Sequence, residues 1–374
     1  MGKVSGKRRR RSRISTAMAP LPSVVGLHPT ELAELFPGDP AAPLRARQVA
    51  AWVYRRRATT FEEMCDLPAA DRQRLASTRS VLGLSVLAEE RADDGVVKLL
   101  LDGGDGQGFE AVLLPFDKRV SCCLSSQVGC AMGCQFCATG LSGFDRNLST
   151  GEIVAQYLLL QTRSARRISH VVFMGMGEPM HNYDAVLGAI RLLNEHVGVS
   201  MRHITVSTVG IVPGIERLGD ERLPIHLAIS LHSPFDSVRS ELIPANKRWG
   251  VAEVVEAGKG YFRKTGRKVT FEYLLIDQVT DSVEQAEELA RLIHGFPCIV
   301  NLIPFNPVPN EHGFRSPKRA RARAFRQALE ACRVKVTQRV ERGQSIAAAC
   351  GQLKGMHTGR FGKGRQPFAR VGSP

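Results

Sequence analysis

The order of apolar and polar positions changes along the chain, and residues 118–314 show the most regular pattern. Short apolar runs there alternate with stretches whose apolar residues recur at helical spacing. The runs predict strands at RVSCCLSS, ISHVVFMG, HITVSTVG, PIHLAISLH, KVTFEYLLI and CIVNLIPF, with helices such as GEIVAQYLLLQ and DSVEQAEELARLI between most of them. Such repeats favour a parallel sheet covered by helices, which right-handed crossovers would curl into a barrel. We therefore predict an α/β fold, a partial (β/α)6 barrel over residues 118–314.

Two other patterns precede this region. Between residues 25 and 85, the segments TELAELF, LRARQVAAWVYRR and LPAADRQRLAS place apolar residues at helical spacing and predict a small helical domain. From 86 to 117, glycines and aspartates interrupt short apolar runs. That alternation predicts a β-hairpin that leads into the barrel.

The two ends of the chain are basic. Residues 1–24 contain KRRRRSR and no acidic residue, which predicts a disordered tail. Residues 315–374 form a predicted C-terminal extension. It begins with a basic helix in RSPKRARARAFRQALEACRV and continues through the turn-rich ERGQSIAAACGQLKG to a basic, Gly-rich end.

Composition adds limits to this picture. The chain has 374 residues, of which 43% are hydrophobic, so it can bury a sizeable interior. No apolar run reaches the roughly 18 residues of a membrane span, so we expect no membrane association. The N-terminus has the charge of a signal peptide but lacks its apolar region, which predicts a cytoplasmic protein.

The net charge of +15 points to a polyanionic partner, and +8 remains after the seven basic residues of the tail are removed. No basic amphipathic helix with an aromatic face is present, so nucleic acid is favoured over a membrane surface. A solvated helix face is the alternative explanation for the first of two candidate RNA contacts. The candidates are Arg315, Lys318, Arg319, Arg321, Arg323 and Arg326 in the C-terminal helix, and Arg45, Arg47, Arg55, Arg56 and Arg57 in the helical domain.

Three of the nine cysteines stand together in CAMGCQFC, as Cys130, Cys134 and Cys137. A reducing cytosol would keep them as thiols, so metal ligation is the better explanation for their spacing. A structural zinc site needs four ligands, and the sequence offers no fourth one nearby. Three thiolates on a cubane iron–sulfur cluster would instead leave one iron open to a small molecule.

The spacing Cys-x3-Cys-x2-Cys after the first strand of an α/β barrel resembles the signature of radical S-adenosylmethionine (SAM) enzymes. The resemblance implies a [4Fe-4S] cluster whose open iron is chelated by SAM. GMGEP at 175–179, after the second predicted barrel strand, resembles the SAM-binding segment of these enzymes.

A longer motif set resembles the RlmN family of dual-specificity RNA methyltransferases over roughly residues 25–355. It comprises CLSSQVGCAMGCQFCATGLSGFDRNLSTGEI, GMGEP, STVGIVPGI, ISLHSP, LIPFNP and AACGQL. The resemblance implies methylation of carbon-2 of an adenosine in 23S rRNA and of one in certain tRNAs. It also implies flavodoxin or ferredoxin as electron donor, and we expect a monomer. The sister Cfr family, which methylates carbon-8, typically has alanine in place of Pro179.

The resemblance also implies roles for particular residues. Cys350 in AACGQL would carry a methyl group, and Glu110 would accept the proton from carbon-2. For the second, resolving thiol, strand alternation separates two neighbours: Cys122 falls on an apolar face, whereas Cys123 shares the other face with serines. Cys123 should therefore face the reaction, and it also matches the family position.

Contacts to SAM are implied for small or polar groups at strand ends. These positions are Gly177, Glu178, Ser207, Ser230, Leu231, His232 and Asn306. Two alternatives remain open: a Cfr-like carbon-8 methyltransferase, and a non-catalytic RNA-binding protein stabilised by zinc.

Overall fold

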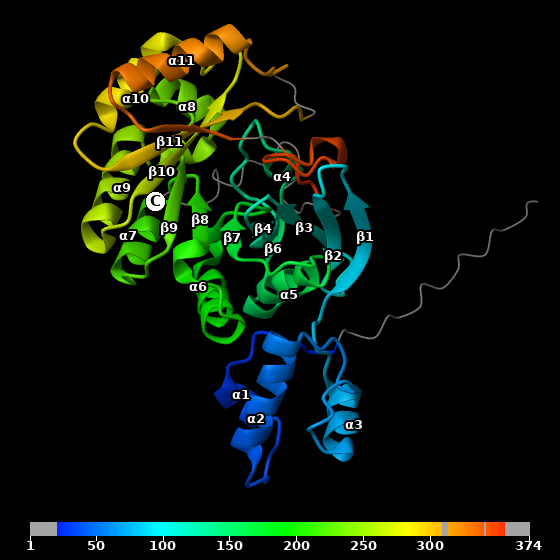
Figure 1. Cartoon of the computed structure of the whole chain (residues 1–374). Helices are drawn as coiled ribbons and strands as arrows, with labels where there is room; N and C mark the ends of the chain where they lie inside the picture. The colour runs from blue at the N-terminus through cyan, green and yellow to red at the C-terminus, as the bar shows by residue number, and fades with distance from the viewer. Residues whose placement is uncertain (1–20, 309–312, 340–341, 356–374) are drawn as a thin grey trace, which may run out of the picture.

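One ten-stranded sheet runs through the molecule in the order β1-β2-β3-β4-β7-β8-β9-β10-β11-β12 (Figure 1). The computed structural model describes residues 21–308, 313–339 and 342–355. Residues 1–20 of the predicted tail and residues 356–374 of the predicted C-terminal extension lie outside these ranges. The strands are β1 Ser85–Arg91, β2 Val97–Asp102, β3 Gly108–Pro115, β4 Val120–Cys123, β7 His170–Phe173, β8 Ile204–Thr208, β9 His226–Ser230, β10 Val269–Leu275, β11 Cys298–Pro304 and β12 Val336–Gln338.

From β4 to β12 each pair of neighbouring strands is parallel. All six predicted barrel strands are present, and the predicted α/β fold class is confirmed. The strand interiors explain why the apolar runs were informative, since Phe271 and Tyr273 on β10 are fully buried. β12 was not predicted, because its three residues are polar or half-exposed and form no apolar run.

Helices follow most of the parallel strands and cover the sheet, as Figure 1 shows. The helices of this region are α5 Thr150–Gln161, α6 Tyr183–Leu192, α7 Val212–Asp220, α8 Asp236–Leu242, α9 Val251–Thr265, α10 Val283–Leu292 and α11 Arg319–Ala331. α11 is the predicted basic helix. It packs on α10 and precedes β12, so the β/α alternation continues beyond residue 314.

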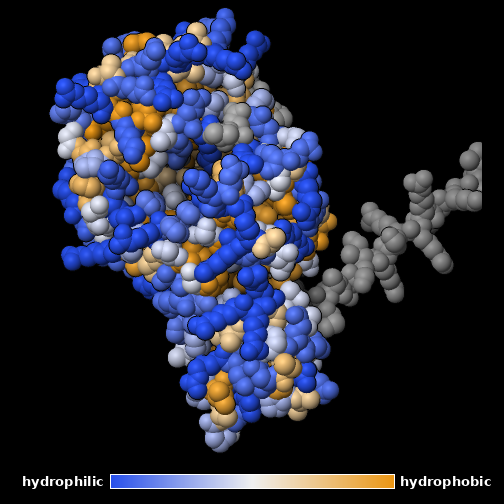
Figure 2. Space-filling model, in the orientation of Figure 1, coloured by the Kyte–Doolittle hydropathy of each residue, from blue (hydrophilic) through white to orange (hydrophobic). Residues whose placement is uncertain are grey.

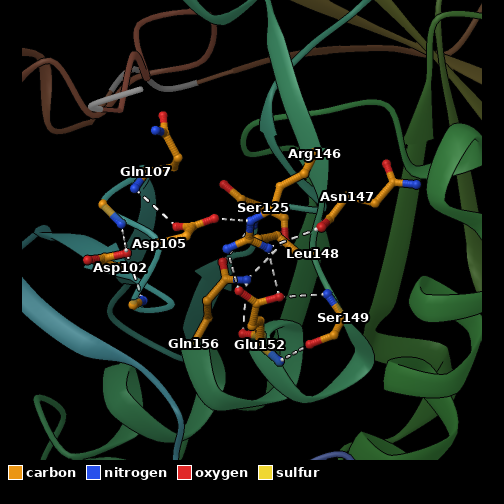
Figure 3. Close-up of polar contacts among 12 residues, drawn as sticks. Asp102, Asp105, Gln107, Ser125, Arg146, Asn147, Leu148, Ser149, Glu152 and Gln156 are labelled. Carbon is orange, nitrogen blue, oxygen red and sulfur yellow. Dashed lines mark hydrogen bonds and ion pairs between the residues drawn. The ribbon is translucent and has the colours of Figure 1, made fainter. Parts of the chain in front are cut away.

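The segment predicted as a hairpin forms three antiparallel strands, β1, β2 and β3, which extend the barrel sheet through β4. A small second sheet, β5 Gln127–Gly129 with β6 Phe144–Asn147, flanks the short helix α4 Ala138–Ser142. Arg146 on β6 connects these parts (Figure 3): it bonds Asp105 in the β2–β3 turn at 2.5 Å and Glu152 at the start of α5 at 2.8 Å. The turn is therefore fixed against the first barrel helix.

The N-terminal helices form a separate layer below the barrel, drawn in blue in Figure 1. They are α1 Pro29–Ala33, α2 Ala42–Ala50, the π-helical η1 Ala51–Arg56 and α3 Ala69–Thr78. Val49, Val53, Met64 and Leu75 are each at most 1% exposed and fill the interior of this unit. None of the helices in the described part of the chain combines the length and apolar composition that a membrane span would require.

Arg239 on α8 is buried completely and holds the carboxyl ends of β8 and β9 in place. Its guanidinium donates to the carbonyl oxygens of Leu231 at 2.9 Å, Val209 at 2.5 Å and Ser230 at 3.1 Å, and to Asn246 Oδ1 at 2.7 Å. Burial lowers the pKa of Arg239 to about 10, so the side chain remains a cation at neutral pH.

We expect Arg239→Met to lower the free energy of unfolding by at least about 3 kcal/mol, because several buried acceptors lose their donor together. A fall of several degrees in the melting temperature of the anaerobic protein would show it. Arg291→Met is the matched control, since Arg291 pairs with Glu288 on the surface. Equal melting temperatures for the two variants would contradict this structural role for Arg239.

Candidate active site

A cavity opens at the carboxyl ends of the parallel strands, where α/β barrels place their chemistry. The space between its walls is about 930 Å³, its open mouth included. Ten of the predicted site residues line it: Cys130, Cys134, Cys137, Gly177, Glu178, Ser207, Ser230, His232, Asn306 and Cys350.

The three clustered cysteines lie on the loop between β5 and α4. Cys130 and Cys134 are 9% and 5% exposed, and Cys137 is the N-cap of α4. Gly140 lets α4 approach this loop, because a Cβ there would stand 2.9 Å from the Cys134 nitrogen. Burial raises the pKa of the Cys130 and Cys134 thiols, and the charges of neighbouring thiolates raise both further. Bound cations would offset this repulsion and hold the sulfurs as thiolates.

The spacing of the three sulfur atoms separates a cluster from a single ion. Around one zinc ion, thiolates at about 2.3 Å from the metal would lie roughly 3.8 Å from one another. The three sulfurs of Cys130, Cys134 and Cys137 do not all lie within 4.8 Å of one another. A cluster distributes its thiolates over several iron atoms, so three thiolates can hold a cubane whose remaining iron is open to a small molecule.

We therefore predict that anaerobically reconstituted protein contains about four irons and four sulfides per chain. Cys134→Ala should lose most of this iron, because one of only three thiolates is removed. Elemental analysis and sulfide determination would check both results. One equivalent of zinc without sulfide would instead support the zinc-stabilised alternative.

Glu178 follows β7 and is 2% exposed. Its carboxylate accepts from the backbone nitrogens of Met180 at 3.0 Å and Val209 at 2.9 Å, so it joins the ends of β7 and β8. Burial raises the pKa of Glu178 to about 7, in spite of these bonds. An amino group of a ligand in the cavity would supply the hydrogen-bond donor that favours the ionised form.

Gly177 lets the segment after β7 pass close to residues 126 and 127, which precede the three clustered cysteines. Its φ is +103°, and a Cβ there would meet the side chains of Gln127 and Ser126 at 2.6 and 2.7 Å. Only glycine satisfies both conditions. The backbone of GMGEP can therefore lie directly against the wall of the cavity.

His232 adopts φ +60° after β9 and is 4% exposed. Its Nδ1 accepts from the Leu274 nitrogen at 2.9 Å, so Nε2 carries the hydrogen. Burial lowers the pKa of His232 to about 3, which keeps the ring neutral. His232 is thus a neutral hydrogen-bond donor in the cavity wall.

The remaining predicted contacts differ in position. Ser207 and Ser230 are half-buried at the ends of β8 and β9 and line the cavity. Leu231, between Ser230 and His232, is fully buried and is not among the lining residues. The Leu231 side chain belongs to the core, which leaves only its backbone close to a ligand.

Cys123 and Cys350 line a second cavity that adjoins the first and shares Arg339 with it. Burial raises the pKa of Cys123 to about 12, and the charge of Cys350 adds to this effect. Burial also raises the pKa of Cys350, whereas the guanidinium of Arg339 lowers the pKa of both thiols. Arg339 therefore opposes the penalty that burial places on either thiolate.

Cys350 lies on a loop, residues 343–355, that covers this second cavity; we call it the Cys350 loop. In Figure 1 the loop is red and lies beside α4 and the ends of β2 and β3. Gly351 accepts from the Ala138 nitrogen at 2.7 Å, and Leu353 accepts from the Thr139 hydroxyl at 2.5 Å. The loop is thereby joined to the helix that follows the three clustered cysteines.

Two predicted residues bind this loop. Asn306, expected at SAM, donates to the Cys350 carbonyl at 3.1 Å and accepts from Gln344 at 3.2 Å. Glu110 on β3 lines neither cavity, and its Oε2 accepts from the nitrogens of Lys354 and Gly355 at 2.8 and 3.1 Å.

Sequence reasoning missed Arg339 and Lys98. Lys98 is 7% exposed on β2, 3.3 Å from Glu110 Oε1. The only signal was a lone lysine inside the apolar run VVKLLL. Arg339 follows β12, whose polar sequence predicted neither a strand nor its place beside the cavity.

Comparison with known proteins independently supports the family resemblance found in the sequence motifs. Residues 124–293 match the radical SAM superfamily, and residues 23–81 match the N-terminal domain of ribosomal RNA large subunit methyltransferases. A probable dual-specificity RNA methyltransferase RlmN of Moorella thermoacetica is 47% identical over 340 residues, 88% of this chain and 96% of the relative. Its counterpart in Geobacillus thermodenitrificans is 43% identical over 350 residues, 92% of this chain and 96% of the relative.

Among solved structures, a radical SAM methyltransferase from Sphaerobacter thermophilus has the same overall arrangement. The TM-score is 0.86 at 44% sequence identity. The match covers 89% of this chain and 99% of that protein.

Proposed function

The chain belongs to the RlmN family of radical SAM RNA methyltransferases, and from that premise we propose that it methylates carbon-2 of an adenosine in 23S rRNA and of one in tRNA. The observation that carries this proposal is the position of Cys123 and Cys350 in the wall of one cavity. That cavity adjoins the one lined by Cys130, Cys134 and Cys137.

Carbon-2 of adenine is an electron-poor amidine carbon, so it does not attack a sulfonium methyl group directly. A carbon radical can add to it. As a radical SAM enzyme, the chain uses a [4Fe-4S] cluster and SAM, which together supply a deoxyadenosyl radical able to remove a hydrogen atom from a methyl group.

The protein's own thiols complete the proposed sequence. Cys350 first takes a methyl group on its sulfur, and this carbon, after losing a hydrogen atom, bonds to carbon-2. Glu110 accepts the carbon-2 proton once the adduct radical has passed one electron to an acceptor, a role that the oxidised cluster would fill. The Cys123 thiolate then attacks the Cys350 sulfur and forms a disulfide. The bond between the Cys350 sulfur and the transferred carbon breaks, and this carbon takes up a proton to become the methyl group of the released base. Arg339 supports this step because it favours both thiolates.

The base must leave its stack to reach a buried thiol, so the RNA must be held on the surface around the cavity. Five of the six basic residues predicted around α11 are exposed: Arg315, Lys318, Arg319, Arg323 and Arg326. Arg321 instead makes two hydrogen bonds to Asp281 at 2.6 and 2.7 Å. Figure 2 shows hydrophilic residues over this upper edge, which suits contact with phosphates.

The N-terminal helices offer a second basic surface. Arg47, Arg55, Arg56 and Arg57 are exposed there, and their unit matches the N-terminal domain of ribosomal RNA methyltransferases. We propose that it binds folded RNA by shape. We propose that the protein acts in the cytoplasm, where its RNA substrate would be, with flavodoxin or ferredoxin as reductant.

Mass spectrometry of the RNA product tests this function. Reconstituted protein with SAM, a reductant and an rRNA fragment should yield 2-methyladenosine, identified against standards of 2- and 8-methyladenosine. A tRNA transcript in a parallel reaction tests the second substrate. Formation of 8-methyladenosine would support the Cfr-like alternative, and no methylated adenosine with intact cluster would contradict the proposal.

A further inference from the structure

Lys98 is a buried cation directly under the Cys350 loop. Its Nζ donates to the Ile346 carbonyl at 2.6 Å and stands 3.3 Å from Glu110 Oε1 and 3.5 Å from the exposed Glu90. Both Lys98 and Glu110 are less than 9% exposed. Burying either the ammonium or the carboxylate without the other would be costly, so each side chain of this pair stabilises the other.

Lys98 and Glu110 bind the Cys350 loop on both sides of Cys350. Lys98 binds its near end at Ile346, and Glu110 binds its far end at Lys354 and Gly355. A loop anchored at both ends has far less conformational freedom between the anchors. Cys350 lies between them.

Strand register places these groups on one face of the sheet. Lys98 is opposite Val112 on β3, and Val112 is opposite Cys123 on β4. Glu110 lies two residues before Val112 and shares its face. The ion pair, the resolving thiol and the Cys350 loop therefore meet on the same side of the sheet.

We infer that Lys98 is a positioning residue for Cys350, and that Glu110 anchors the Cys350 loop in addition to its proposed role as proton acceptor. This inference rests on the proposed function, in which Cys350 must first receive a methyl group from SAM. That first step needs no RNA and no proton acceptor at carbon-2. The positioning role can therefore be measured separately from the later chemistry.

Loading of Cys350 in the absence of RNA and reductant tests the inference. Reconstituted wild-type and Lys98→Met proteins are incubated with SAM, and methylation of Cys350 is followed by peptide mass spectrometry. We expect Lys98→Met to load at least about tenfold more slowly at saturating SAM, with unchanged iron content and SAM affinity. A general structural defect would lower iron content or SAM affinity as well.

Lys354→Met is the matched control. It removes a lysine from the same network, but Lys354 is exposed and contacts Glu110 through its backbone nitrogen only. We expect it to load at the wild-type rate. Glu110→Gln should load slowly too, which separates loop anchoring from proton transfer.

The outcomes are distinguishable. If wild-type Cys350 gains no methyl group, the proposed function fails; if Lys98→Met and wild type load equally fast, the inference alone fails. Should Lys98→Met not retain iron, Lys98→Gln keeps a polar tip but is too short to reach both partners. Slow loading by that variant supports the positioning role, and wild-type loading overturns it.

Discussion

Cys350→Ala is expected to abolish RNA methylation while iron content stays at the wild-type level. The variant has no sulfur to carry the methyl carbon, and no other described cysteine shares the Cys350 loop. Cys350 lines the cavity beside the three clustered cysteines but is not one of them, so the cluster ligands remain intact. Methyl transfer to an rRNA fragment, assayed with elemental analysis of the same sample, would check this.

Cys332→Ala is the control for Cys350→Ala. Cys332 is exposed at the end of α11, so its loss should leave the rate of methylation unchanged. Normal turnover by Cys350→Ala would show that the methyl group reaches RNA without this thiol. The proposed S-methylcysteine route would then be wrong.

Cys123→Ala is expected to accumulate protein covalently bound to RNA. The Cys350 thiol can still be methylated and add to carbon-2, but among the described residues no other thiol lines this second cavity to attack its sulfur. Released product should fall by about 100-fold or more, as expected when an essential nucleophile is removed. Denaturing gel electrophoresis with labelled RNA would detect the adduct, and nuclease digestion followed by mass spectrometry would locate it at Cys350.

Cys122 provides an adjacent control. It is fully buried on the opposite face of β4, and burial raises the pKa of its thiol well above the usual value, so it stays neutral. Cys122→Ala should cost about 1 kcal/mol in stability by leaving a small cavity, without trapping RNA. Equal amounts of adduct from both variants, or none from Cys123→Ala, would contradict the assignment of the resolving thiol.

Much of the fold could be predicted because the buried strands are apolar and continuous. β10, with Phe271 and Tyr273 fully buried, is the clearest case. β12 could not be predicted, since it pairs at the sheet edge through its backbone and carries no apolar run. Backbone pairing at an edge leaves little trace in side-chain pattern.

The candidate site was predictable where residue type alone implies chemistry, as for Cys130, Cys134 and Cys137. It was not predictable where tertiary contacts decide the role. Asn306 binds the Cys350 loop, and Lys98 acts through a carbonyl about 250 residues further along the chain. No local pattern contains that information.

The antiparallel pairing of β3 with β4 also determines how far apart Glu110 and Cys123, the two candidate catalytic groups of the sheet, lie. Glu110 and Cys123 belong to strands joined by a short turn, with Val112 opposite Cys123. A slip of one residue in this pairing would turn one set of side chains to the other surface. The pairing of β3 with β4 thus sets the distance between Glu110 and Cys123. A one-residue insertion in residues 117–119 that shifted this pairing would separate the Glu110 carboxylate from the Cys123 thiol without altering either residue.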